Sequence, residues 1–367
     1  MIIPTKPLAI LLVAVVVCFS SPFCLGVSAQ EEDIHAALYQ ETPYPPASAC
    51  MSCHPVHYKE WSVSPHAYAQ LSPVSNAMQA KINELTNGTL GDFCIRCHTP
   101  TGITLKEPVF AATADRAQVS REGVTCVVCY RRNKTYGNVS SRFSPLQGGL
   151  TDKIYGSQGN VELRRVIDSG NYDVETDPQK QGRHIHTDAE KFYQITTSAF
   201  CGSCHDVNLP TGFRLEEAFS EYKASPASRA GISCQDCHMG KVPGIPSGYA
   251  SEPVAIIGGE PSAPRKRTNH MFVGPDYSII HPGIYPHNPA ASSLASLREW
   301  LQFNFSAGWG TDEYEEGLHG DETFPDRWAD ASDRYEAREI LEENLALLKQ
   351  ADRDRLTLLK NGYQFGD

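Results

Sequence analysis

Five pairs of cysteines, each pair separated by two residues, recur along this chain of 367 residues. In four of the pairs the residue directly after the second cysteine is histidine, and in the fifth it is tyrosine. Any fold of this chain must therefore accommodate one kind of site that is repeated along the sequence. The five motifs comprise Cys50, Cys53 and His54; Cys94, Cys97 and His98; Cys126, Cys129 and Tyr130; Cys201, Cys204 and His205; and Cys234, Cys237 and His238.

The Cys-x-x-Cys-His motif is the attachment signature of haem c, in which two thiols form thioethers and the adjacent imidazole binds the iron. Paired zinc-binding motifs lie about 15–20 residues apart, whereas the gaps here are longer, and zinc does not need a histidine after each pair. Zinc and structural disulfides remain the alternatives. The pattern predicts covalently bound haem at four motifs, a function in handling electrons, and four proximal iron ligands: His54, His98, His205 and His238.

The N-terminal residues have the pattern of a secretory signal peptide. Lys6 precedes an apolar run over residues 8–19, and residues 27–29 have the small-x-small form that signal peptidase cleaves. We expect residues 1–29 to be removed, which leaves Gln30 as the first residue. A retained membrane anchor is the competing interpretation, but the run is shorter than the roughly 20 residues that span a bilayer. The sequence thus predicts export to the periplasm, the cell surface or the extracellular space, without a retained transmembrane span.

Composition limits the fold and the partners. Of the 12 cysteines only Cys18 and Cys24 lie in the signal segment, so every remaining cysteine belongs to a pair. The 25 Pro and 28 Gly, with few long apolar runs, predict a mainly α fold with extensive irregular loops, in which haem supplies part of the apolar volume. The formal net charge of −11 excludes an obvious affinity for nucleic acid. Basic redox proteins, including other cytochromes, are the expected partners.

An internal repeat organises the middle of the chain. Cys126 follows Cys94 by 32 residues, and Cys234 follows Cys201 by 33 residues. The first motif of each set leads into Pro-Thr-Gly, and each second motif is preceded by glycine and an aliphatic residue. These features predict two copies of a two-haem unit, at about residues 93–130 and 200–238.

The repeat aligns Tyr130 with His238, so that tyrosine occupies a ligand position. Three interpretations follow. Haem is attached and the Tyr130 phenolate binds the iron, as a tyrosine does in catalase. Alternatively, haem is attached and the iron takes a ligand from elsewhere in the chain. In the third interpretation the site has lost its haem, so Cys126 and Cys129 are free or joined to each other. Tyr130 is therefore the candidate catalytic residue of an atypical fifth haem.

Low-spin haems need a second axial ligand, so the other histidines are informative. Nine of the 13 histidines lie outside the motifs, enough to give every haem a distal imidazole. These are His35, His57, His66, His184, His186, His270, His281, His287 and His319.

The segment Trp61-Ser62-Val63-Ser64-Pro65-His66-Ala67 resembles the Trp-x-x-Ser-x-His-Ala segment of the cytochrome c-552/c-554 family. Residues 269–274 and 231–238 are also similar to segments of that family, so the resemblance extends over roughly 45–275. It implies that His66 and His270 are distal ligands and that haems form closely stacked pairs. His184 or His186 is a further candidate, followed by His281 and His287.

The resemblance, with the pattern of the last hundred residues, predicts the domain organisation. Residues 30–275 form a multihaem cytochrome domain wrapped around stacked haems, and residues 276–367 form a linker rich in Pro and His and a C-terminal helical segment. Apolar residues at near-helical spacing predict helices over about 292–303 and 327–360.

Two functions remain in contention. The first is an electron-transfer protein with four or five haems, which we favour over an enzyme because four motifs are complete. The second is an oxidoreductase that converts a small nitrogen or sulfur compound at the haem of Cys126, Cys129 and Tyr130. A weaker hypothesis is a subunit of a polymeric cytochrome wire. The sequence makes no prediction of the oligomeric state.

Overall fold

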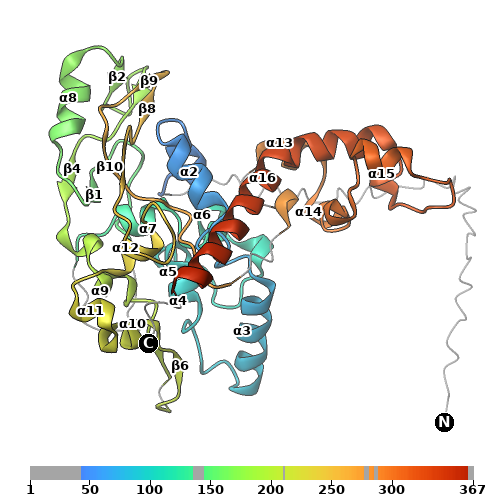
Figure 1. The fold of residues 1–367 in the computed structure, drawn as a ribbon, viewed down its shortest axis with the longest axis horizontal. Helices are drawn as coiled ribbons and strands as arrows, with labels where there is room; N and C mark the ends of the chain where they lie inside the picture. Colours follow the sequence, from blue (N-terminus) through green and yellow to red (C-terminus); the bar gives the residue numbers. More distant parts are fainter. Residues whose placement is uncertain (1–42, 135–143, 210, 277–280, 285–287, 363–367) are drawn as a thin grey trace, which may run out of the picture. The chain divides into compact units, whose positions relative to one another are not determined.

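The structure, a computed structural model, describes residues 43–134, 144–209, 211–276, 281–284 and 288–362. Among these residues about 45% lie in helices and about 8% in strands, with many loops between them. The prediction of a mainly helical, loop-rich fold with a C-terminal helix is therefore confirmed (Figure 1). The wrapping of the chain around stacked haems stays a prediction.

Most of the helices are short. The α-helices are α1 (Ala47–Met51), α2 (Pro55–Ser62), α3 (Pro73–Leu85), α4 (Ile95–His98), α5 (Pro100–Thr104), α6 (Gln118–Arg121), α7 (Cys126–Tyr130), α8 (Val161–Ser169), α9 (Ser198–Cys201), α10 (Ala218–Ala224), α11 (Pro226–Arg229), α12 (Cys234–His238), α13 (Pro289–Leu294), α14 (Leu297–Trp300), α15 (Asp312–Glu316) and α16 (Ala331–Gly362). Single 3₁₀ turns cover Thr113–Asp115, Tyr193–Thr196, Pro282–Ile284, Phe305–Ala307 and Asp326–Trp328.

The strands form small two-stranded sheets. Two pairs are parallel: β1 (Ile154–Gly156) with β4 (Ala189–Lys191), and β2 (Val174–Glu175) with β3 (Arg183–His184). Three pairs are antiparallel: β5 (Val207–Asn208) with β6 (Arg214–Glu216), β7 (Ala250–Glu252) with β10 (Arg265–Arg267), and β8 (Ile256–Ile257) with β9 (Glu260–Pro261). In the β7–β10 pair Glu252 lies opposite Arg265.

Apolar side chains gather in several small clusters, as the composition predicts for a chain that lacks a large core. One cluster surrounds Trp61 and joins α1, α2, the segment of Met271 and Val273, and Leu358 of α16. Another belongs to the C-terminal segment and contains Ala291, Ala295, Trp300, Phe303, Trp309, Trp328, Ala337 and Leu341. No helix in the described ranges is long and apolar enough to cross a membrane.

The helix predicted over residues 292–303 is two helices in the structure, α13 and α14. Ala295 between them is extended, with φ −152° and ψ 155°. Ser296 then begins α14 through a capping box with Glu299, in which each side chain bonds to the other residue's backbone N–H. The Ser-x-x-Glu pattern was visible in the sequence and marks this new start.

The last predicted helix, over about 327–360, is found as α16, with a separate 3₁₀ turn over its first expected residues. Leu341 is fully buried, and Leu358 packs into the cluster around Trp61. Asn361 donates a hydrogen bond to the carbonyl of Pro243 at 3.0 Å. The end of α16 is therefore attached to the part of the chain that carries the motifs. Leu356, one of the apolar residues of this helix, is 43% exposed.

Candidate haem-attachment site

Each motif is one helical turn. The backbone N–H of His54 bonds to the carbonyl of Cys50 at 2.8 Å, and that of His205 bonds to the carbonyl of Cys201 at 2.9 Å. A turn of this kind places the first cysteine and the histidine on one side, since residues four apart in a helix are neighbours. Helix α7 places Cys126 and Tyr130 in the same relation. The third motif, which ends in Tyr130, therefore has the local form of the other four.

The ten thiols of the motifs are partly buried and free of disulfides. Some come into hydrogen-bonding contact across motifs: Cys50 with Cys126, Cys97 with Cys204, and Cys201 with Cys234. These contacts join segments up to 107 residues apart in the sequence. The tertiary structure thus gathers motifs that the sequence separates.

The four motif histidines share one hydrogen-bonding pattern. In each, Nδ1 bonds to a fixed acceptor, and within the described ranges Nε2 makes no hydrogen bond. Since a carbonyl or carboxylate only accepts, Nδ1 carries the hydrogen and Nε2 presents its lone pair, as in metal-binding histidines. The acceptors are Val254 O for His54 at 2.7 Å, Ala69 O for His98 at 2.7 Å, Glu216 Oε1 for His205 at 2.8 Å, and Val273 O for His238 at 2.7 Å.

His205 differs from the other three because its acceptor is charged. The Glu216 carboxylate raises the pKa of His205 through this hydrogen bond. A carboxylate behind a ligand histidine makes the imidazole a stronger base toward a metal.

His66 lies opposite a motif histidine, as the family resemblance implies for a distal ligand. Its ring centre is 6.0 Å from that of His205, with 47° between the two planes. Burial lowers the pKa of His66 to about 3, so its imidazole is neutral, the form that binds a metal.

Of the neighbouring candidates His184 and His186, the geometry favours His186. His186 Nδ1 bonds to the carbonyl of Leu150 at 2.8 Å, which leaves Nε2 for a metal, and burial lowers its pKa to about 4. His54 is among its electrostatic neighbours. The Nε2 atom of His184 instead bonds to the carbonyl of Lys180 at 2.9 Å.

His270 is buried and faces Tyr130. Its Nδ1 bonds to the carbonyl of Thr268 at 3.0 Å, and its Nε2 lies 3.1 Å from the Tyr130 hydroxyl. Burial raises the pKa of Tyr130 well above its ordinary value, and it lowers the pKa of His270 to about 4. Without a cation at its oxygen Tyr130 is therefore a neutral phenol, whose O–H donates a hydrogen bond to His270 Nε2.

The two remaining candidates contribute less. His281 bonds through Nε2 to the carbonyl of Phe303 at 2.8 Å, and its Nδ1 accepts from the N–H of Gly283 at 3.0 Å. Both nitrogens are thus used within the C-terminal segment. His287 lies outside the described residues.

The sequence did not single out His57, which the structure places in this region. Its Nδ1 is buried without a hydrogen-bond partner in the described part of the chain, and burial lowers its pKa to about 2. Its ring centre lies 4.6 Å from that of His270 and 5.9 Å from that of His54. Its position three residues after His54, one helical turn away, was the available signal.

Glu122 is a second residue that sequence reasoning missed. Both carboxylate oxygens lie 3.0 Å from the N–H of Ala47, and the hydroxyl of Thr125 donates to Oε2. The side chain is fully buried, and burial raises its pKa to about 8. Glu122 therefore joins the start of α1 to the segment before α7, and so the first motif to the third.

The family segment around His66 makes a second link to the third motif. The indole of Trp61 donates to the carbonyl of Val124 at 2.9 Å, and the N–H of Val124 donates to the carbonyl of His66 at 3.0 Å. Gly123 has φ +64°, and a Cβ there would lie 2.6 Å from the carbonyl oxygen of His66. Glycine is thus required where the backbone passes closest to His66.

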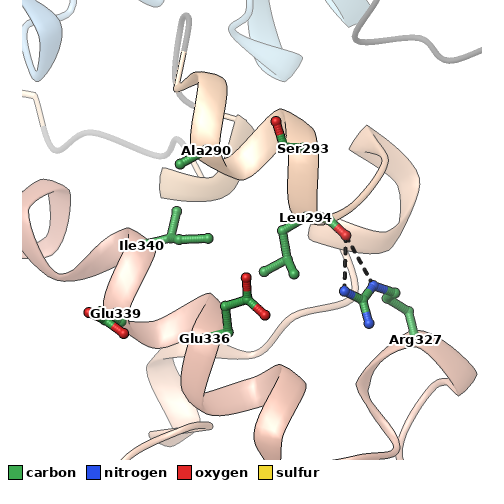
Figure 2. Close-up of a pocket in the computed structure, with 7 residues that line it drawn as sticks. All are labelled: Ala290, Ser293, Leu294, Arg327, Glu336, Glu339 and Ile340. Carbon is green, nitrogen blue, oxygen red and sulfur yellow. Dashed lines mark hydrogen bonds between the residues drawn. The ribbon is translucent and has the colours of Figure 1, made fainter.

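A pocket of about 480 Å³ lies between α13 and α16, away from the motifs (Figure 2). It contains no residue of the five motifs, and Arg327 at its edge bonds to the carbonyl of Leu294 at 3.0 Å. Within the described ranges, no group of three or more His, Cys, Asp or Glu side chains is arranged to hold a metal ion. The lining residues are Ala290, Ser293, Leu294, Arg327, Glu336, Glu339 and Ile340.

Comparison with known proteins identifies one family. Residues 49–130 match the family described as cytochrome c554 and c-prime. The match contains the first three motifs and the segment of Trp61 and His66, so the resemblance read from the sequence is confirmed over these residues. No curated protein sequence and no solved structure matches the chain.

Proposed function

We propose that this chain, whose residues 49–130 match the cytochrome c554 and c-prime family, is an exported multihaem cytochrome that passes electrons between redox partners. Haem c would supply a one-electron iron couple at each motif. The observation that carries the proposal is the shared orientation of His54, His98, His205 and His238, each with Nδ1 fixed and Nε2 open. Orientation of this kind is the protein's contribution to a metal site.

We assign His66 as the distal ligand opposite His205. The ring centres of His66 and His205 lie 6.0 Å apart, and these two residues would hold the iron of one haem between them. The neutral state of buried His66 supports the same role.

For the first motif we assign His54 and His186 as the axial pair. Each histidine bonds through Nδ1 to a backbone carbonyl, and each has its Nε2 free within the described ranges. Each carbonyl belongs to a segment far from its histidine in the sequence, at Val254 and Leu150. Such long-range bonds set the direction of both rings before haem attachment.

A further haem would be attached at Cys126 and Cys129, and Tyr130 and His270 are the residues that would hold its iron. The Tyr130 hydroxyl and His270 Nε2 lie 3.1 Å apart, so both ligand atoms are directed to the same place. Iron at this position would also replace the phenol proton and stabilise the phenolate that burial otherwise disfavours.

Contacts between thiols suggest the order of the haems. Cys50 contacts Cys126, so the first motif neighbours the third. Cys204 contacts Cys97, and Cys201 contacts Cys234, so the fourth motif neighbours the second and the fifth. Cys129 is an electrostatic neighbour of Cys201 and Cys204. We therefore propose an electron path from the first motif through the third to the fourth, with the second and fifth as branches.

A second function is favoured by one observation, the hydrogen bond between Tyr130 and His270. If Tyr130 alone binds the iron and His270 stays off, the open face could take a small nitrogen or sulfur compound, with His270 as its nearest base. The chain would then be an oxidoreductase.

Mass spectrometry of the mature protein tests the proposal first. We expect a chain that starts at Gln30 and carries five haems, and fewer than four would contradict the assignment of the complete motifs. Ferric EPR then separates the two functions, because a relay with six-coordinate irons shows low-spin signals. A high-spin signal that changes when nitrite, hydroxylamine or sulfite is added would favour the oxidoreductase.

Export and partner choice complete the proposal. The acidic composition supports docking to basic redox proteins, including other cytochromes, through interactions that weaken with salt. We propose that residues 30–275 form the haem domain and that the C-terminal segment covers part of it through α16. The packing of Leu358 against the cluster around Trp61 supports this arrangement.

A further inference from the structure

The segment that carries His270 is fastened to α2 by Glu60. The Glu60 Oε2 atom accepts the backbone N–H of His270 at 2.9 Å, and its Oε1 atom lies 2.5 Å from Arg267 Nη1. Only 9% of Glu60 is exposed. A carboxylate with two such donors holds the peptide at both ends of a four-residue segment, so Glu60 limits where the His270 ring can lie.

Helix α2 also contacts the ring of His270 directly. His57, one helical turn before Glu60, packs edge-on against His270 with 4.6 Å between ring centres and 78° between planes. Two side chains of one short helix therefore contact His270, one at the backbone and one at the imidazole. Because His54 is the N-cap of α2, the helix that holds His270 starts at the proximal histidine of the first motif.

Arg267 provides an internal comparison. It bonds to Glu60 and, through Nε, to Glu252 Oε2 at 2.7 Å. The Glu252 side chain is 53% exposed, whereas that of Glu60 is 12% exposed. Both carboxylates thus neutralise the same guanidinium, but of the two only Glu60 also bonds to His270. A comparison of Glu60 and Glu252 variants can therefore separate the loss of a charge beside Arg267 from the loss of the hydrogen bond to His270.

We propose that Glu60 is a positioning residue for His270, the proposed iron ligand at the third motif. Through α2, Glu60 also links His270 to the first motif. The inference rests on the proposed attachment of haem at Cys126 and Cys129. Loss of Glu60 leaves the N–H of His270 buried without its acceptor, and the segment moves to find another partner. His270 then no longer faces Tyr130 in a fixed geometry.

The test compares three variants of the full-length haem-loaded protein: Glu60→Ala, Glu60→Gln and Glu252→Gln. Haem number is measured by mass, and ferric EPR and the visible spectrum report the ligands of each haem. In Glu60→Ala we expect an unchanged number of haems and a shift or loss of one haem's signal. Glu60→Gln keeps a carbonyl acceptor, so its signal should be closer to wild type. Glu252→Gln should leave all signals unchanged.

The outcomes distinguish the possible failures. If Glu60→Ala carries five haems with wild-type signals, the proposed role of Glu60 is wrong, but the haem at Cys126 and Cys129 stands. Changes in several haems at once, or an equal change in Glu252→Gln, also overturn the role of Glu60, because they indicate a general or purely electrostatic effect. If the wild-type protein carries only four haems, the proposed attachment of haem at Cys126 and Cys129 is wrong, and the role of Glu60 is wrong with it. If Glu60→Ala fails to fold by circular dichroism, Glu60→Gln decides: a small shift confined to the signal of one haem supports the positioning role, and signals identical to those of the wild type contradict it.

Discussion

The hydroxyl of Tyr130 lies 3.1 Å from Nε2 of His270, across 140 residues of sequence, in a partly buried position. Tyr130 occupies the place that histidine takes in the other four motifs, and His270 belongs to a segment similar to a ligand segment of the family. Their contact unites two features that the sequence offered separately. It also makes the site testable by substitution of either residue.

Replacement of Tyr130 by histidine should convert the third site into an ordinary bis-histidine centre. Tyr130→His restores the attachment motif, and an imidazole there faces His270 Nε2, which already presents a lone pair. We expect the ferric EPR signal of this haem to be replaced by a bis-histidine low-spin signal, with the haem number by mass unchanged at five. An unchanged spectrum with five haems in both proteins would contradict the placement of Tyr130 at the iron.

Removal of His66 should open one axial position, because its ring lies 6.0 Å from that of His205. We expect His66→Ala to keep all its haems and to gain one high-spin ferric signal, which added imidazole should abolish. His319→Ala is the matched control, since His319 is exposed and far in sequence from every motif. A spectrum identical to wild type would show that another residue binds opposite His205.

Stability should fall with rising pH because of Glu122. Its pKa is raised from 4.5 to about 8 in the folded protein, so the folded state holds a proton that the unfolded state releases between these values. The stabilisation is complete below about pH 4.5 and is lost as pH rises to about 8, at most about 1.4 kcal/mol per pH unit. Urea midpoints measured from pH 5 to pH 8 check this slope.

Glu122→Gln provides the control for that slope. Glutamine cannot ionise, and its carbonyl can still accept from the N–H of Ala47. The variant should lose the pH dependence that Glu122 contributes and retain most of the stability at pH 5. Equal slopes in the two proteins would mean that other groups cause the dependence.

Gly123→Ala should destabilise the protein by more than the same change at Gly91. Both glycines have positive φ, +64° and +59°, but a Cβ at Gly123 meets the carbonyl oxygen of His66 at 2.6 Å, whereas a Cβ at Gly91 meets nothing within 4 Å. The backbone penalty, about 1 kcal/mol, applies to both. Melting temperatures of the two variants should therefore differ, and equal values would argue against a close approach at His66.

Local features were predictable from the sequence alone. The motifs are single helical turns, because a span of five residues sets the relation between the first cysteine and the ligand position. The segment of Trp61 and His66 could be recognised by resemblance. The break between α13 and α14 was missed although Ser296 and Glu299 mark it, because the apolar spacing of Leu294, Leu297 and Leu301 suggested one continuous helix.

Longer-range relationships could not be read in this way. Glu60 and Glu122 look like ordinary surface carboxylates in the sequence, and only their burial against His270 and Ala47 reveals their role. His57 was one of nine histidines outside the motifs, and its position one helical turn after His54 was the one local pattern that distinguished it. For His54, His98, His186 and His238, which nitrogen is free depends on a backbone carbonyl that lies 29 to 200 residues away.

The sequence by itself therefore determined where the paired thiols and the motif histidines occur, since each motif spans one helical turn. Only the tertiary structure decided which histidine lies near which motif, which thiols meet, and that Tyr130 contacts His270. The physical reason is that these contacts depend on how segments distant in the sequence pack together. Backbone hydrogen bonds between distant segments set that geometry, and no local spacing encodes it.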